Sequence, residues 1–281
     1  MVQANNYKVE NFDPEVLREY DIRGVVGKNI NENTAYTIGR TFGHTVKSKL
    51  TSHTIVTGYD GRLTSPSLHK ALCEGLKDSG VKVINIGMGP TPMTYFAHYH
   101  FEADAAVMLT GSHNPSEYNG FKMVFNKHSF FAEDIQSLQK LLDNNELELA
   151  VGQIINQDIT KEYIERVLLN ISLNRKLKIA WDPGNGAMGK VTREITEKLI
   201  NSENIIINEE VDGNFPNHHP DPTVPKNMIQ LIEAVKENNC DIGLAFDGDG
   251  DRLGVIDNLG NIVWADQYML LLCLEIAKLY D

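Results

Sequence analysis

The chain of 281 residues has little cysteine, no long apolar run and no excess of positive charge. Its three cysteines, Cys73, Cys240 and Cys273, are far apart and form no Cys-x-x-Cys pair, which argues against a disulfide framework and a zinc site. The longest apolar stretch, residues 268–274, is too short to span a bilayer, and the N-terminus lacks the basic start and apolar core of a signal peptide. We therefore expect a cytoplasmic protein in a reducing compartment.

The formal net charge of -12 limits the partners that the chain can bind. An acidic surface repels nucleic acid phosphates and anionic lipid, and no basic cluster offsets it, so we expect neither nucleic acid nor a membrane as partner. An acidic protein can still bind an anionic sugar phosphate where Arg, Lys, backbone N–H groups or a metal ion gather locally.

Hydrophobic residues make up 42% and charged residues 23% of the chain, which is typical of a globular protein, and the length favours two domains with a piece of a third. Short β-rich runs alternate with helical patterns in two series, which predicts an α/β fold. The expected strands are 54–57, 81–86 and 105–110 in the first series, and 177–181, 205–208 and 242–246 in the second. The expected helices are 67–79, 91–100, 190–201 and 226–238.

The two series are similar enough to indicate a diverged duplication. Each opens with a strand that ends in a tight turn, at Asp60 or at Asp182, and each contains a small-residue strand that leads into a polar loop. We predict two similar three-layer α/β domains with mixed sheets, residues 1–156 and 157–262, whose special loops face a shared cleft at the carboxyl ends of strands. Residues 263–281 read as a helix that begins a third domain or, alternatively, docks on the second.

The segment DGDGDR, residues 247–252, is the strongest chemical signal. Asp247, Asp249 and Asp251 alternate directly after an apolar strand, and the intervening glycines let an extended or turning backbone aim the three carboxylates to one side. Ligands that are all oxygen suit Mg²⁺, Ca²⁺ or Mn²⁺ rather than Zn²⁺. A solvated acidic turn is the simpler interpretation, but Arg252 beside the carboxylates favours a site that also receives an anion such as phosphate.

A second signal is the segment TGSHNP at residues 110–115, which places Ser112 at the end of a strand in a turn opened by glycine. It is not the nucleophile elbow of a hydrolase, because no glycine stands two residues after the serine. His113, as the sequence neighbour of Ser112, would normally point elsewhere. By composition alone the segment is a polar turn that an Asn-Pro pair ends.

The loop at residues 182–190 allows two rival interpretations. It contains Gly-x-Gly-x-x-Gly between a strand and a helix, with Glu209 about twenty residues further on, as dinucleotide-binding proteins do. It also contains Gly-x-x-x-x-Gly-Lys, but Val191 stands where a nucleotide hydrolase needs Ser or Thr to hold magnesium. A tight strand-to-helix turn that requires small residues is the third interpretation, and we expect the loop to bind neither ATP nor NAD.

The segment TGSHNPSEYNGFK at residues 110–122, followed by DGDGDR, resembles the α-D-phosphohexomutase superfamily and specifically its phosphomannomutase/phosphoglucomutase branch. Four further segments support the resemblance, and they occur in the same order as in the family. They are EYDIRG at 19–24, GYDGR at 58–62, GPTP at 89–92 and FPNHHPDP at 215–222, so the resemblance covers the whole chain. Members of that family have four domains around a deep cleft, and the first three share one α/β topology. The resemblance implies two complete domains here and the beginning of a third, without the family's sugar-recognition loop or its phosphate clamp.

The resemblance implies an intramolecular phosphotransferase that interconverts hexose 1-phosphate and hexose 6-phosphate, with mannose and/or glucose as the sugar. Phosphorylated Ser112 gives its phosphoryl group to a hydroxyl of the substrate, and a hexose 1,6-bisphosphate intermediate, which also serves as activator, returns its other phosphate to Ser112. Lys122 and His113 match the positions for proton transfer or charge stabilisation. Arg23 and Arg252 match those that contact the phosphate oxygens, because a guanidinium binds them in bidentate fashion.

The same resemblance makes Asp247, Asp249 and Asp251 the ligands of Mg²⁺, with Ser112 as a further ligand through its phosphate. Two alternatives stay open. The chain can be a truncated mutase that binds Mg²⁺ and sugar phosphate without turnover, or a dinucleotide-dependent oxidoreductase that uses the 182–190 loop.

Overall fold

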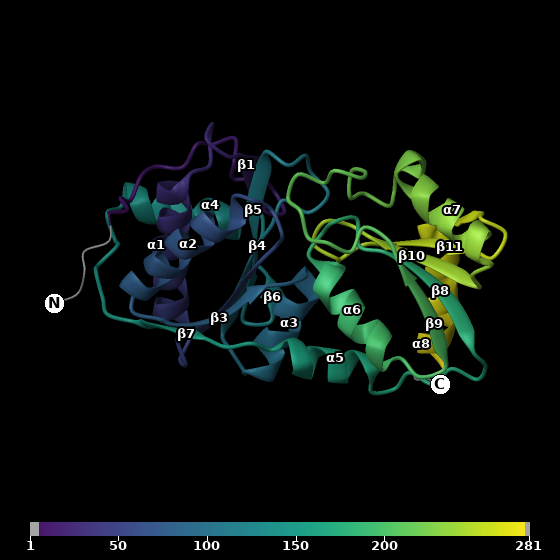
Figure 1. Ribbon diagram of the computed structural model, residues 1–281. Coiled ribbons are helices and arrows are strands. Elements are labelled where there is room, and N and C mark those ends of the chain that lie inside the picture. Colours follow the sequence, from purple (N-terminus) through teal and green to yellow (C-terminus); the bar gives the residue numbers. More distant parts are fainter. Residues whose placement is uncertain (1–5, 279–281) are drawn as a thin grey trace. The chain divides into compact units, whose positions relative to one another are not determined.

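The computed structural model describes residues 6–278 and divides the chain into two compact units, Met1–Tyr163 and Ile164–Asp281. Each unit is built on its own mixed β-sheet, so the predicted α/β class with mixed sheets is confirmed (Figure 1). The division falls within helix α5 (Thr160–Leu168). Among the described residues, no helix is long and apolar enough to cross a membrane.

The sheet of unit 1 has the strand order β1-β5-β4-β2-β3-β7, with β6 paired to β5. Strands β4, β2, β3 and β7 are parallel to one another, and β5 is antiparallel to β4, β1 and β6. The strands are β1 (Ile22–Val25), β2 (Thr54–Tyr59), β3 (Lys82–Met88), β4 (Ala105–Leu109), β5 (Tyr118–Phe125), β6 (His128–Ser129) and β7 (Gln153–Asn156).

Helices cover both faces of this sheet. The core on one face joins Ile55, Val107 and Leu109 to helices α1, α2 and α4, whereas Met108 points to the opposite face and accepts a hydrogen bond from Thr94 of α3. This alternation is what a strand buried on both sides requires, and it gives the three predicted layers (Figure 1). The helices are α1 (Glu32–Lys49), α2 (Ser65–Asp78), α3 (Thr91–His100) and α4 (Glu133–Asp143).

The sheet of unit 2 has the order β12-β11-β10-β8-β9, in which β10, β8 and β9 are parallel and β11 and β12 complete it in antiparallel pairing. Helix α7 packs on one face through a cluster that includes Leu231, Val235 and Ala245. On the other face Trp181 stacks on Phe246. The elements are β8 (Leu177–Asp182), α6 (Met188–Lys198), β9 (Ser202–Ile206), a 3-10 turn (Pro225–Met228), α7 (Ile229–Asn238), β10 (Ile242–Phe246), β11 (Leu253–Asp257), β12 (Ile262–Val263) and α8 (Ala265–Ala277).

The two sheets share a common part, as the sequence predicted. The order β5-β4-β2-β3 in unit 1 matches β11-β10-β8-β9 in unit 2, and in each the first strand is antiparallel to the other three. The predicted bounds of α3 and β10 agree with the structure to the residue. The strand expected at 205–208 lies instead at Ser202–Ile206, because short apolar runs define strand ends poorly.

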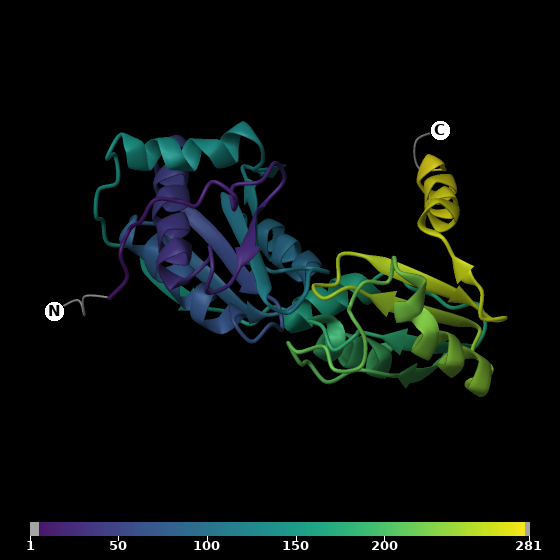
Figure 2. The ribbon, with the colours of Figure 1, turned by 90° about the horizontal axis from the view of Figure 1, so that it is seen from above.

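Helix α8 extends away from the sheet of unit 2 (Figure 2). None of its residues is buried, and its attachment includes a hydrogen bond from Tyr268 Oη to the carbonyl oxygen of Leu253, 2.8 Å long. Helix α8 therefore contacts unit 2 without adding a buried residue to its core. That residues 263–281 begin a third domain remains a proposal.

Candidate functional site

Ser112 lies in a buried turn directly after the fully buried strand β4. Its exposed fraction is 2%, and its backbone takes the left-handed conformation with φ of 50°, which is uncommon for a residue other than glycine. Its N–H donates to Thr110 Oγ1 over 2.7 Å. A non-glycine residue keeps such a backbone only where its surroundings hold it, so the turn is a built feature of unit 1.

His113 lies beside the serine hydroxyl, with 3.2 Å between Ser112 Oγ and His113 Nδ1. The expectation that this histidine points elsewhere is therefore wrong. Neighbouring side chains point apart in extended backbone, but the left-handed backbone at Ser112 interrupts that alternation. The contact allows a proton to move between the hydroxyl and the imidazole.

Lys122 and Arg23 belong to the neighbouring strands β5 and β1. Arg23 pairs with Gly120, two residues from Lys122, so the register places both cations on one face of the sheet. Arg23 forms an ion pair with Asp21, and its buried Nε has no hydrogen-bond partner among the described residues. A buried guanidinium N–H of this kind suits an anionic acceptor such as phosphate.

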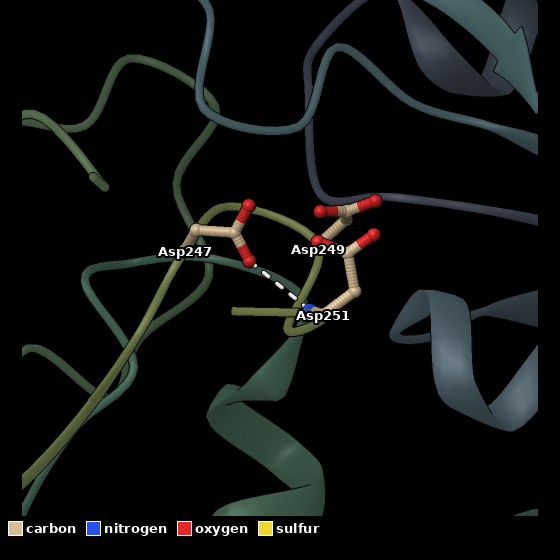
Figure 3. Close-up of side chains that lie close together, drawn as sticks. All are labelled: Asp247, Asp249 and Asp251. Atoms are coloured by element: carbon tan, nitrogen blue, oxygen red, sulfur yellow. Dashed lines mark hydrogen bonds between the residues drawn. The ribbon is translucent and has the colours of Figure 1, made fainter. Parts of the chain in front are cut away.

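In unit 2, Asp247, Asp249 and Asp251 converge in the turn between β10 and β11 (Figure 3). Each offers one carboxylate oxygen within 4.8 Å of the others. Asp247 and Asp249 are fully buried, whereas Asp251 is exposed. Gly250, with φ of 71°, provides the left-handed residue that the turn needs.

The backbone of this turn is held by its own first carboxylate. Asp247 Oδ1 accepts a hydrogen bond from the N–H of Asp251 at 3.0 Å (Figure 3). It also accepts one from the N–H of Arg252 at 3.1 Å. Arg252 Nε lies 4.0 Å from Asp247 Oδ2, and its half-exposed side chain remains accessible to an anion. Three converging carboxylates, two of them buried, fit a divalent cation that prefers oxygen ligands, because buried negative charge needs compensation.

The loop at residues 182–190 packs against the carboxylate turn. The N–H of Ala187 donates to the carbonyl oxygen of Gly248 over 3.0 Å, and a Cβ on Gly186 would lie 2.8 Å from that same oxygen. Only glycine fits at residue 186 without displacing the turn. The sequence showed this loop as rich in glycine but did not show what it packs against.

The predicted site residues therefore form two groups, one in each unit. In unit 1, Ser112 and His113 follow β4, and Lys122 and Arg23 lie on the adjoining strands β5 and β1. In unit 2, the three aspartates and Arg252 follow β10. Because β4 and β10 are equivalent strands of the shared sheet order, the serine loop and the carboxylate loop occupy equivalent places in the two units.

Comparison with protein families decides to which family the chain belongs. Phosphoglucomutase/phosphomannomutase α/β/α domain I matches residues 14–148, and domain II of the same family matches residues 161–260. The chain belongs to the phosphoglucomutase/phosphomannomutase family. The predicted resemblance to the α-D-phosphohexomutase superfamily is confirmed.

Individual relatives of this mutase-family chain are longer than the chain itself. A phosphomannomutase/phosphoglucomutase of Pseudomonas putida is 46% identical over 263 residues, which are 94% of this chain and 56% of that protein. A phosphoglucomutase of Neisseria meningitidis serogroup A is 41% identical over 95% of this chain and 58% of its own length. The crystal structure of a family protein from Burkholderia thailandensis matches with a TM-score of 0.90 at 38% identity, over 95% of this chain and 60% of that one. The chain spans a little over half the length of these relatives.

The 182–190 loop of this mutase-family chain has few free amides to offer a nucleotide phosphate. The N–H groups of Gly184, Asn185, Gly186, Ala187 and Gly189 all donate to oxygens of the protein. Glu209, the residue that would bind a ribose, pairs with Arg193 on α6 instead. A phosphate-binding loop needs backbone N–H groups aimed at the ligand, so these contacts favour the tight turn over both nucleotide interpretations.

The partly buried His218 and the fully buried Asp182 form a pair beside the same loop. His218 Nε2 lies 2.9 Å from Asp182 Oδ2. Burial lowers the pKa of His218, but the hydrogen bond and the charge of Asp182 outweigh burial, so the pKa lies above its ordinary value. Neither residue was predicted to be functional. The only signal was their place in FPNHHPDP and in the turn after the first strand of unit 2.

Proposed function

We propose that this chain carries the phosphate-carrying serine and the metal site of an enzyme that interconverts hexose 1-phosphate and hexose 6-phosphate, with mannose and/or glucose as the sugar. One observation carries the proposal: equivalent strands of two similar sheets end in the serine loop and in the carboxylate loop. A phosphoryl carrier and a cation site are the two components that phosphoryl transfer needs, since its catalysis rests on positioning and charge stabilisation. We place the enzyme in the cytoplasm, and its three cysteines are free.

Ser112 is proposed to alternate between phosphoserine and free hydroxyl. The bond from Ser112 Oγ to phosphorus breaks as a bond from phosphorus to a hydroxyl oxygen of the hexose monophosphate forms, and the proton of that hydroxyl passes to a base. The product, a hexose 1,6-bisphosphate, then returns its other phosphate to Ser112 in the reverse of this step. The same bisphosphate serves as activator, because it phosphorylates a chain whose serine is free.

Four side chains are proposed to assist this transfer. His113, 3.2 Å from Ser112 Oγ, can exchange a proton with the serine oxygen, and Lys122 stabilises or accepts the proton of the sugar hydroxyl. Arg23 and Arg252 bind phosphate oxygens, and the buried unpartnered Nε of Arg23 supports its part in this.

Asp247, Asp249 and Asp251 are proposed to hold Mg²⁺, with the phosphate of Ser112 as a further ligand. When bound, the ion supplies a Lewis acid that offsets the charge of about -1.5 to -2 on a phosphoserine. The carboxylates themselves keep the turn after β10 in place, because Asp247 also accepts two backbone hydrogen bonds.

The chain spans 56% of its Pseudomonas putida relative, so turnover by the chain alone is a separate question from phosphorylation of its serine. The alternative is a chain that binds Mg²⁺ and sugar phosphate without turnover. An assay of glucose 1-phosphate conversion separates the two, whereas the following experiment tests the site itself.

The test is to incubate the chain with glucose 1,6-bisphosphate and Mg²⁺ and to locate the added phosphate by intact and peptide mass spectrometry. We expect one phosphate on Ser112, none in Ser112→Ala, and normal labelling in Ser116→Ala, an exposed serine of the same loop. Magnesium should bind more tightly to the phosphorylated form. Phosphate on another residue, or equal magnesium affinity in both forms, would contradict the proposal.

A further inference from the structure

Arg62 is an unusual residue to find beneath the serine loop. It lies in the turn between β2 and α2, its exposed fraction is 1%, and it is among the largest fully buried side chains of the protein. Its Nε donates to Asp60 Oδ2 over 3.2 Å, and Asp60 is equally buried. Buried charged pairs are costly to desolvate and are weak evidence of stabilisation, so this pair calls for another role.

The guanidinium of Arg62 donates to the backbone of a single loop. Its Nη2 donates to the carbonyl oxygens of Ser112 and Asn114, at 2.8 and 2.6 Å. Its Nη1 donates to those of Pro115 and Tyr118, at 2.5 and 3.1 Å. With the bond to Asp60, these contacts use all five N–H donors of an arginine. Arg62 therefore holds the loop and has no donor left for a substrate.

Asp60 holds the other side of the same serine. Its Oδ2 accepts from Thr110 Oγ1 at 2.8 Å and from the N–H of Gly111 at 3.1 Å. Thr110 Oγ1 in turn accepts the N–H of Ser112. The N–H of Ser112 is thus tied to Asp60 through one threonine, and its carbonyl is tied to Arg62 directly.

The guanidinium of Arg62 and the backbone of the serine loop are in close contact. A Cβ on Gly111 would lie 2.4 Å from both Cζ and Nε of Arg62, so the guanidinium lies directly against the loop backbone. Ser112 beside it keeps a left-handed backbone, which must be imposed by such surroundings.

We infer that Asp60 and Arg62 are positioning residues that fix the backbone of Ser112 and thereby the direction of its hydroxyl. The inference rests on the proposed function of Ser112 as the phosphate carrier. All five N–H donors of Arg62 bond to oxygens of the protein. Asp60 and Arg62 therefore affect the rate of phosphoryl transfer and not the binding of the sugar phosphate.

The test compares Arg62→Lys with the unmodified chain. Lysine keeps the charge but has one nitrogen, which cannot span four carbonyl oxygens. Arg193→Lys is the matched control, since Arg193 pairs with Glu209 at the surface of unit 2. The measurements are the rate of Ser112 phosphorylation at a series of glucose 1,6-bisphosphate concentrations, and amide hydrogen exchange of residues 110–119.

We expect the saturating rate of Arg62→Lys to fall by about 100-fold, because a small misplacement of a reacting group causes a loss of this size. The half-saturating concentration of glucose 1,6-bisphosphate should be nearly unchanged. Exchange should rise at the loop amides, such as those of Ser112 and Asn114, and stay unchanged in α1 and β2. The control should match the unmodified chain in both measurements.

A normal rate in Arg62→Lys, or exchange that rises equally throughout unit 1, would overturn the inference. If the unmodified chain takes no phosphate on Ser112, the proposed function fails, and exchange alone then decides whether the pair holds the loop. If Arg62→Lys does not fold, Asp60→Asn replaces it, because it keeps the shape of Asp60 and removes its charge. Unchanged loop exchange in that variant also overturns the inference.

Discussion

Two buried aspartates, Asp60 and Asp182, occupy equivalent positions at the ends of β2 and β8. Asp60 accepts hydrogen bonds from the serine loop and from Arg62, and Asp182 accepts from Gly184 N–H and from His218. A carboxylate has two oxygens and accepts several donors at once, so one residue can tie together loops that follow different strands. The side chain that donates to the carboxylate differs, being the guanidinium of Arg62 in unit 1 and the imidazole of His218 in unit 2.

Asp249→Asn is expected to weaken magnesium binding at least about tenfold, which corresponds to about 1.4 kcal/mol. Asp249 is fully buried in the carboxylate cluster, and asparagine removes one negative charge without changing the shape of the side chain. Titration calorimetry with Mg²⁺ measures the affinity. Asp212→Asn, a half-buried aspartate of the same unit, should bind as the unmodified chain does. Unchanged affinity in Asp249→Asn would remove this residue from the metal site.

Acid stability should depend on His69 of α2. Burial lowers the pKa of His69 to about 4, against 6.5 in the unfolded chain. The unfolded chain therefore takes up this proton first as the pH falls, so the contribution of His69 is complete above pH 6.5 and is lost between pH 6.5 and 4. From pH 7.5 to 5 the loss is about 2 kcal/mol.

His69→Gln removes this titration, so its free energy of unfolding should fall less between pH 7.5 and 5, by about 2 kcal/mol, than that of the unmodified chain. Urea unfolding at the two pH values measures the difference. His100→Gln replaces an exposed histidine of α3 and should behave like the unmodified chain. An identical pH dependence in all three proteins would show that His69 does not titrate as argued.

Helices α1 and α2 pack unusually closely in unit 1. A Cβ on Gly75 would lie 2.2 Å from the carbonyl oxygen of Tyr36, and one on Gly39 would lie 2.3 Å from that of Leu72. Each glycine thus faces the backbone of the opposite helix. The sequence pattern predicted α2 but not what covers it, since α1 was not among the predicted helices.

Gly75→Ala is expected to destabilise unit 1 by about 1 to 2 kcal/mol, because overpacking against a backbone outweighs the gain in helix propensity. Without the clash, the same change should stabilise the helix by about 1 kcal/mol. The sign of the change in urea unfolding decides between the two. Lys70→Ala, on the exposed side of α2, serves as the control and should change stability little.

At the scale of the whole molecule, each unit has its own core, while α8 has none. Six large apolar residues of α8 are at least half exposed, among them Leu270 at 61% and Leu271 at 62%. A contiguous apolar surface of this kind promotes association.

Leu271→Lys combined with Leu274→Lys is therefore expected to make the chain more monodisperse in size-exclusion chromatography with light scattering, without lowering the stability of unit 2. Neither leucine is buried, so neither contributes core packing. Leu231→Lys, which places a charge in the core beneath α7, should instead unfold unit 2. A double variant as unstable as Leu231→Lys would show that α8 packs on the unit after all.

Local patterns were sufficient for the α/β class, for the repeat of two similar domains and for the alternating carboxylates after β10. These features depend on hydrophobic periodicity and on the spacing of neighbouring residues, and both can be determined from the sequence alone. Three contacts could not be predicted from the sequence. They are the contact of Ser112 with His113, the hydrogen bonds of Asp60 and Arg62 to the serine loop, and the packing of Gly186 on Gly248. Each joins loops that follow different strands or depends on a left-handed backbone, so it exists only once the sheet has brought those loops together.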